Sequence, residues 1–258
     1  MTHAARPRPT TGVVLDVEGT TTPISFVYDV LFPYAFERLR RFLSARMGDA
    51  DVERAVALLR DEHNAEVAGG EIVPAWRSGA AGELDAIVAY LEWLMDRDRK
   101  SPGLKLLQGQ IWELGYLDGT LRGEVYPDVL PAFERWRAAG RQIAIYSSGS
   151  VLAQRLLFAN STWGDMTGFI DGYFDTSVGP KRVSESYRRI AAAMRRDAGD
   201  LLFISDVAAE LDAARDAGFR TLLCVRAPAK MPATSTSGVV QTFDDVDGLF
   251  AGAGVPSN

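Results

Sequence analysis

Short apolar runs bounded by turn residues recur along the chain and predict the buried strands of a parallel sheet. The candidates are residues 12–15, 142–146, 201–204 and 221–225, with shorter ones at 172–174 and 239–240. Between these runs the apolar residues recur at helical spacing. Strands that alternate with helices in this way predict an α/β fold with a doubly wound parallel sheet.

One long stretch interrupts this alternation. From residue 34 to about residue 116 the apolar spacing is helical, and no segment is typical of a strand. In the first helix of this stretch Phe36, Leu39 and Leu43 fall on one face, and Asp51 is a candidate N-cap of the next helix. Such an insertion after the first strand predicts a lid that excludes water from the sheet's carboxyl edge. The expected organisation is a disordered tail (1–11), a core (12–32 and 117–258) and an inserted all-helical cap (33–116).

Composition and charge limit the classes of function. The net charge of −6 over 258 residues disfavours a nucleic-acid partner, because phosphate backbones need a basic face. No apolar stretch approaches the about 20 residues of a membrane-spanning helix, and the Pro- and Arg-rich start lacks the apolar region of a signal peptide. A single cysteine, Cys224, excludes an intrachain disulfide and fits a small core residue in a reducing compartment. We therefore expect a cytoplasmic protein without membrane or nucleic-acid partners. We also expect a monomer, although these features do not bear on the oligomeric state.

Four polar clusters follow the predicted strands or their connections. They are Asp16 with Glu18, Ser147 with Ser148, Lys181, and Asp206. Each has an ordinary explanation when taken alone, such as a turn cap, a helix N-cap or a solvated lysine. The carboxyl ends of parallel strands meet at one edge of a sheet, so together the clusters predict one ligand site. The histidines, His3 and His63, are not placed for this chemistry, and we expect both at the surface.

In this order the four clusters resemble the motifs of the haloacid-dehalogenase-like phosphatase superfamily. Three longer stretches resemble one of its families, the methionine-salvage enolase-phosphatases or acireductone synthases. They are Val-Glu-Gly-Thr-Thr-Thr-Pro-Ile-Ser-Phe-Val (17–27), Lys-Leu-Leu-Gln-Gly-Gln-Ile-Trp (105–112) and Tyr-Ser-Ser-Gly-Ser-Val (146–151). Glu18 agrees with that family, in which glutamate replaces the second aspartate of most relatives. The stretch Gly179-Pro180-Lys181 departs slightly from the family pattern but keeps the lysine aligned.

The resemblance implies a Rossmann-like core of the superfamily and a bifunctional enzyme that acts on a small phosphorylated substrate. Such an enzyme converts 2,3-diketo-5-methylthiopentyl-1-phosphate to its enol and then dephosphorylates it to the acireductone 1,2-dihydroxy-3-keto-5-methylthiopentene. Asp16 would be the nucleophile that forms an aspartyl-phosphate, since a carboxylate is ionised at neutral pH and needs no activating base. Glu18 would protonate the leaving oxygen and activate water, and Lys181 would stabilise the phosphoryl charge.

The same resemblance assigns the binding groups. Ser147, Ser148 and Lys181 would bind the phosphate. One Mg²⁺ per chain would be held by the Asp16 carboxylate, the Glu18 backbone carbonyl and the Asp206 side chain, and it would offset the repulsion between two anions. Glu210, four residues after Asp206, is interpreted as a helix-face residue or as a support for these ligands.

Several questions stay open at this stage. The enol step needs a base, and a carboxylate, Glu18 first, is our hypothesis, with Lys100, Lys105 and Gln108 as possible contacts from the cap. The main alternative is another phosphomonoesterase of the superfamily that acts on a sugar or amino-acid phosphate. A receiver module phosphorylated on Asp16 is disfavoured by the long helical insertion. A dehalogenase would need no metal and would not require Glu18 or Asp206.

Overall fold

The computed structural model describes residues 9–77, 79, 82–97, 99–229 and 235–250, and its backbone divides into two compact units. The α/β unit combines Met1–Phe26 with Arg122–Asn258, and the helical unit is Val27–Leu121. Most of the predicted tail lies outside the described residues. In the last part of this tail Thr10 is buried. The Thr11 amide donates to the Asp200 carbonyl, and the Thr11 carbonyl accepts from the Gln142 amide.

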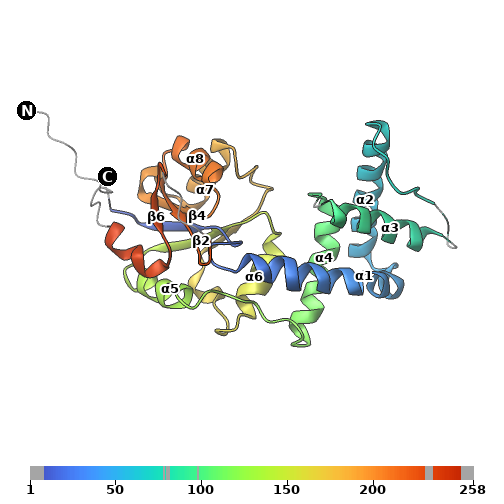
Figure 1. Ribbon diagram of the computed structural model, residues 1–258, viewed down its shortest axis with the longest axis horizontal. Coiled ribbons are helices and arrows are strands. Elements are labelled where there is room, and N and C mark those ends of the chain that lie inside the picture. The colour runs from blue at the N-terminus through green and yellow to red at the C-terminus, as the bar shows by residue number, and fades with distance from the viewer. Residues whose placement is uncertain (1–8, 78, 80–81, 98, 230–234, 251–258) are drawn as a thin grey trace, which may run out of the picture. The chain divides into compact units, whose positions relative to one another are not determined.

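The α/β unit contains a six-stranded, fully parallel sheet in the order β3-β2-β1-β4-β5-β6, which confirms the predicted α/β fold (Figure 1). Its strands are β1 Gly12–Leu15, β2 Gln142–Tyr146, β3 Gly172–Phe174, β4 Leu201–Ser205, β5 Arg220–Cys224 and β6 Gly238–Val240. The register pairs Leu15 with both Ile145 and Ile204. The residue after β1 therefore stands between the ends of β2 and β4, where the strand order reverses and open sheets bind their ligands.

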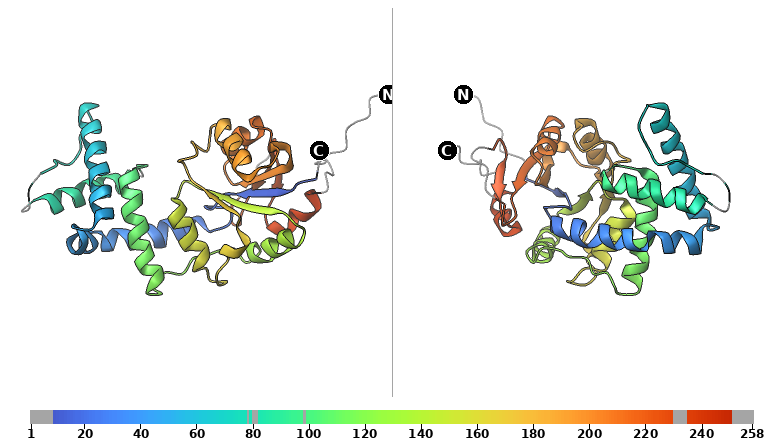
Figure 2. Two further views of the ribbon diagram at one scale, coloured as in Figure 1. Left: turned by 180° about the vertical axis from the view of Figure 1, so that it is seen from behind. Right: turned by 45° about the vertical axis from the view of Figure 1, so that its right-hand side comes forward.

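Helices cover both faces of the sheet. They are α5 Val129–Ala138, α6 Val151–Ala159, α7 Ser184–Met194 and α8 Ala208–Asp216, with single turns at Thr167–Phe169, Ala198–Asp200, Phe243–Asp245 and Asp247–Leu249. Two views show α7 and α8 on one face and α5 and α6 on the other (Figures 1 and 2). Alternate strand residues, among them Val14, Ala144 and Phe203, join one apolar cluster with α7 and α8. Because both faces are covered, the strands appear in the sequence as continuous apolar runs.

The helical unit contains α1 Phe32–Arg46, α2 Ala50–Ala68, α3 Glu83–Asp96 and α4 Pro102–Leu117, preceded by a π-helical turn at Phe26–Leu31. No strand occurs among the described residues of this unit, as the sequence predicts. Ser101 caps α4, since its hydroxyl accepts from the Leu104 amide at 3.0 Å. A Cβ atom on Gly103 would lie 2.6 Å from Cγ of Leu59, so α2 and α4 pack closely through this glycine.

Three local expectations were wrong, and one was confirmed. Phe36 is 45% exposed, because the buried stripe of α1 runs through Leu39, Leu43 and their neighbours. The helix predicted to begin after Asp51 begins at Ala50. His63 is buried rather than at the surface, because it continues the stripe of Val56 and Leu59 on α2. Cys224 is a buried residue of β5, as predicted.

His63 belongs to an aromatic cluster of the helical unit. Its Nε2 atom lies 2.8 Å from the carbonyl oxygen of Pro74, and its ring contacts those of Trp76 and Tyr90 edge-on. His3 lies outside the described residues. Of the helices in the described part of the chain, none is both long and apolar enough to cross a membrane.

Candidate active site

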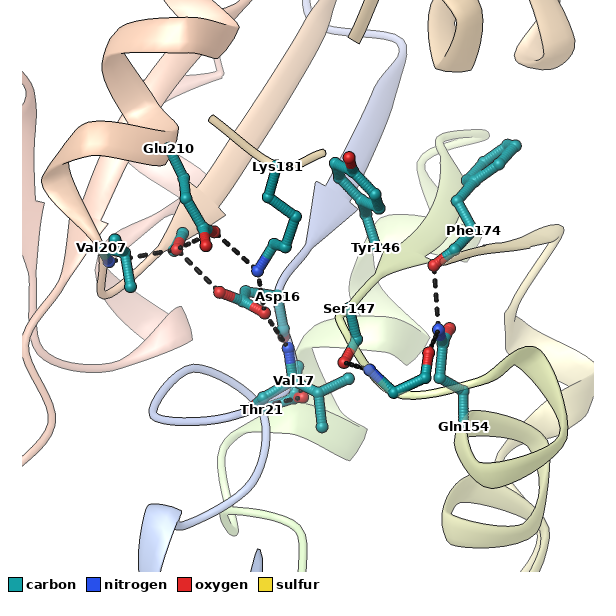
Figure 3. A network of polar contacts seen from close by, with 12 residues as sticks. Asp16, Val17, Thr21, Tyr146, Ser147, Gln154, Phe174, Lys181, Val207 and Glu210 are labelled. Carbon is teal, nitrogen blue, oxygen red and sulfur yellow. Dashed lines mark hydrogen bonds and ion pairs between the residues drawn. The ribbon is translucent and has the colours of Figure 1, made fainter. Parts of the chain in front are cut away.

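Asp16 lies at the centre of the sheet's carboxyl edge. It directly follows β1, and its backbone amide still donates to the Ile204 carbonyl at 3.0 Å. The side chain is nearly inaccessible and both of its oxygens are bound. Oδ1 accepts from the amide of Val17 at 2.8 Å, and Oδ2 accepts from the hydroxyl of Ser205 at 2.8 Å (Figure 3). The carboxylate is therefore held in one orientation before any ligand arrives.

Lys181 reaches Asp16 from the loop that precedes α7. Its Nζ atom lies 2.7 Å from Asp16 Oδ1 and 2.6 Å from Oε2 of Glu210 (Figure 3). Burial alone would lower the pKa of this lysine, but the two adjacent carboxylates raise it above its usual range. The side chain is therefore a buried, permanently charged ammonium between two acids.

Glu210 and Ser205 complete this cluster. Glu210 is on the first turn of α8, where it is buried, and its Oε2 lies 3.2 Å from the Ser205 hydroxyl. Burial, and then the charge of Asp16, raise the pKa of Glu210 to about 7. The sequence left Glu210 either as a helix-face residue or as a support for the ligands, and it missed Ser205. The strand register, which places Ile204 beside Leu15, is the signal that could have revealed the serine.

Asp206 lies against the loop that follows β1. A Cβ atom on Gly19 would be 2.3 Å from Oδ2 of Asp206, and Gly19 has a φ of +69°, so both space and conformation favour glycine here. Burial raises the pKa of Asp206 to about 6, with further contributions from Asp16 and Glu18 that outweigh the opposing effect of Lys181. Three carboxylates of the predicted site thus act on one another electrostatically.

The donor chemistry at this edge fits Mg²⁺. In the described part of the chain no group of three or more histidine, cysteine, aspartate and glutamate side chains is arranged to hold a metal ion. Mg²⁺ does not require such a cage, since it commonly keeps several waters and binds through one or two carboxylates. Burial, and then the neighbouring carboxylates, raise the pKa of Asp206, and a divalent cation would relieve the repulsion among these carboxylates.

Ser147 and Ser148 follow β2, the strand next to β1. The Ser147 side chain is buried and its hydroxyl accepts from the amide of Gly149 at 3.0 Å. The N-cap of α6 is Ser150, so the two preceding serines are not used as caps. Gln154 fixes this turn by donating to the carbonyls of Gly149 at 3.0 Å and of Phe174 at 2.9 Å, a contribution that the sequence did not reveal (Figure 3).

The remaining predicted residues lie in two places. Glu18 is partly buried in the loop after β1, and a backbone bridge joins it to Thr22. Lys100, Lys105 and Gln108 belong to the helical unit, in which Gln108 is buried on α4. The structure thus brings Asp16, Lys181 and Glu210 into direct contact, with Asp206 and Ser147 at the neighbouring strand ends.

Comparison with known proteins identifies a family model and close relatives of the chain. The sequence matches the haloacid dehalogenase-like hydrolase family model over residues 10–218. The protein named Enolase-phosphatase E1 from Synechococcus elongatus is 49% identical over 238 residues, covering 92% of this chain and 97% of that protein. Its namesake from Klebsiella oxytoca is 47% identical over 234 residues, covering 91% and 95%.

Solved structures resemble the chain over nearly its whole length. The UTR4 protein of Saccharomyces cerevisiae superposes with a TM-score of 0.71 at 31% identity, covering 92% of this chain and 99% of that one. CbbY from Rhodobacter sphaeroides, solved with phosphate, gives a TM-score of 0.57 at 16% identity over 94% and 99% of the two chains. At that identity the second likeness shows the fold alone.

Proposed function

The chain belongs to the enolase-phosphatase E1 family of the haloacid dehalogenase-like hydrolases, and from this premise we propose a mechanism in which Asp16 carries the phosphoryl group. The substrate is 2,3-diketo-5-methylthiopentyl-1-phosphate, which is first enolised and then dephosphorylated to the acireductone of methionine salvage. The observation that carries the proposal is the buried Asp16 carboxylate, oriented by Ser205 and Val17 and paired with Lys181.

The phosphate step uses Asp16 as its nucleophile. An Asp16 oxygen attacks phosphorus, the bond to the enol oxygen breaks, and Glu18 supplies the proton that the leaving oxygen needs. Glu18 then removes a proton from water, which attacks the aspartyl-phosphate and releases inorganic phosphate. The Lys181 ammonium, 2.7 Å from Asp16 in the free protein, is placed to stabilise charge on the phosphoryl oxygens.

Ser147 and Ser148 are proposed to bind the phosphate together with Lys181. The serines stand at the end of the strand next to Asp16, in a turn that leads into α6. Backbone amides and hydroxyls before a helix are suited to an anion. Because Gln154 bonds to the turn, its amides keep one orientation as the phosphate binds.

One Mg²⁺ is proposed at the Asp16 and Asp206 carboxylates and the Glu18 carbonyl. When bound, it supplies the positive charge that lets an anionic nucleophile approach an anionic ester. The raised pKa of Asp206 and the contact between Gly19 and Asp206 support this position. Omission of Mg²⁺ is expected to abolish phosphate release.

In the enol step Glu18 is assigned as the base that removes a proton from the carbon bearing the phosphate, and the neighbouring carbonyl oxygen takes up a proton from water. The described part of the α/β unit contains no histidine that could act as this base, and its cysteine, Cys224, is buried in β5. Deuterium exchange at the carbon that bears the phosphate should therefore be lost in Glu18→Gln. Undiminished exchange in that variant would exclude Glu18 as the base.

The helical unit is proposed to act as the cap. Its bounds, Val27–Leu121, are wider than the predicted cap of 33–116. A cap can exclude water and select the substrate, and Lys100, Lys105 and Gln108 stay predicted contacts. The monomeric state and the cytoplasmic location likewise stay predictions.

A substrate panel tests the whole assignment. Phosphate release is measured with the diketone phosphate, a sugar phosphate and an amino-acid phosphate, with Asp16→Asn as the inactive control. We expect the highest kcat/KM for the diketone phosphate, together with the absorbance of the enol and the acireductone. A higher kcat/KM for a sugar or amino-acid phosphate would favour the alternative phosphomonoesterase.

A further inference from the structure

The loop that carries Lys181 has three consecutive backbone carbonyls, and each accepts a hydrogen bond from a buried side-chain hydroxyl. The pairs are Tyr146 with Gly179 (2.9 Å), Ser186 with Pro180 (2.8 Å) and Tyr187 with Lys181 (2.7 Å). We propose that these three hydroxyls, the hydroxyl clamp, are positioning residues that hold the Lys181 backbone so that its ammonium remains at Asp16 during phosphoryl transfer. This inference rests on the proposed role of Lys181.

The two tyrosine hydroxyls of the clamp come from rigid parts of the core. Tyr146 is the last residue of β2 and Tyr187 is on α7, and both side chains are fully buried. Their rings meet edge-on with centroids 5.5 Å apart, and the Tyr187 ring makes a second such contact, at 5.1 Å, with Phe203 of β4. Neither ring can turn without disturbing close packing, so the hydroxyls stand at fixed positions.

The third donor, Ser186, depends on a glycine. Gly179 has a φ of +140°, and a Cβ atom on it would lie 2.3 Å from Oγ of Ser186. The loop backbone therefore runs directly against the first turn of α7, where only glycine fits. This close approach allows Ser186 to reach the next carbonyl, that of Pro180.

The ammonium group of Lys181 lies next to two carboxylates. Its ammonium lies 2.7 Å from Asp16 and 2.6 Å from Glu210, and 5.8 Å from the Tyr146 ring centroid. A lysine has a long, flexible stem, so a shift of its backbone would let the ammonium stay with Glu210 and leave Asp16. Displacement of a charge-stabilising group by about 1 Å can cost about a hundredfold in rate.

Tyrosine-to-phenylalanine variants test the clamp, because they remove a hydroxyl and keep the ring. Tyr187→Phe and Tyr146→Phe should each lower kcat for phosphate release about tenfold, and together about a hundredfold, while KM changes little. The matched control is Tyr173→Phe on β3, whose buried hydroxyl has no hydrogen-bond partner among the described residues. This control should keep the parent kcat. Equal losses in the control and the clamp variants would overturn the proposal.

A double-mutant cycle with Lys181→Ala separates positioning from a general structural effect. If the clamp acts through Lys181, Tyr187→Phe causes no further loss of kcat in the Lys181→Ala background. A further tenfold loss there would refute the clamp. Should a tyrosine variant fail to fold, Ser186→Ala takes its place in the same cycle with the same expected result. If Lys181→Ala itself keeps full activity, the proposed role of Lys181 fails, and the clamp fails with it. If Lys181→Ala is impaired and the clamp variants are not, only the clamp fails.

Discussion

Replacement of Arg226 by methionine should destabilise the α/β unit strongly. Arg226 follows β5, and its guanidinium makes two hydrogen bonds to the Thr20 carbonyl at 2.7 and 2.9 Å. It also pairs with Asp128 at 2.7 Å and lies over the rings of Tyr126 and Phe243. This arginine therefore connects the end of β5 to the loop that contains Glu18 and Gly19.

The magnitude follows from burial. The Arg226 and Asp128 side chains are only 7% and 10% exposed, so Arg226→Met leaves a buried carboxylate without its cation. We expect this to lower the free energy of unfolding by about 4 kcal/mol. Arg137 and Asp171 form the matched control. They are 38% and 30% exposed, and Asp171 also accepts from a backbone amide, as Asp128 does. Arg137→Met should cost about 1 kcal/mol or less.

Urea denaturation followed by far-ultraviolet circular dichroism measures both losses. With a slope of about 3 kcal/mol/M, the midpoint should fall by about 1.3 M for Arg226→Met and by about 0.3 M for the control. Adding Asp128→Asn to Arg226→Met should recover about 2 kcal/mol, because it removes the unpaired charge and keeps an acceptor for the Phe243 amide. Equal midpoints for the two arginine variants, or no recovery in the double variant, would refute the reasoning.

Two glycine substitutions give further predictions. Gly19→Ala should lower phosphate release about a hundredfold, because the new Cβ would displace the Asp206 carboxylate, whereas Gly140→Ala, at a φ of +74° with open space, should leave release unchanged. Parent-like release from Gly19→Ala in a phosphate assay would count against the position of Asp206. Gly103→Ala should lower the free energy of unfolding by about 1–3 kcal/mol through overpacking against Leu59, despite the helix propensity of alanine. Gly48→Ala, which meets no neighbour within 4 Å, is its control in urea denaturation, and a stabilised Gly103→Ala would contradict the prediction.

The strands and the helical insertion were predictable because their signals are local. Each strand is an apolar run ended by turn residues, and strands that alternate with helices pair in parallel. One error arose where residue type was weighed above position. His63 was expected at the surface as a histidine, although its spacing from Val56 and Leu59 places it on the buried stripe of α2.

The chemistry-bearing residues of the site were predictable, but most of their supports were not. Asp16 and Lys181 were identified by motif, and they meet in the structure. Ser205 and the donors of the hydroxyl clamp act through contacts between distant segments, which exist only once the sheet is assembled. Arg226 and Thr20 are separated by 206 positions, so no local pattern could pair them.

Trapping the phosphorylated protein tests the central claim most directly. The diketone phosphate, labelled on its phosphate, is mixed with protein and Mg²⁺ and quenched in acid within one turnover, and the labelled peptide is identified by mass spectrometry. Label should accumulate on Asp16 in the parent protein, and it should be absent in Asp16→Asn. Rapid turnover with no labelled protein, or with label on another residue, would contradict the assignment of Asp16 as the nucleophile.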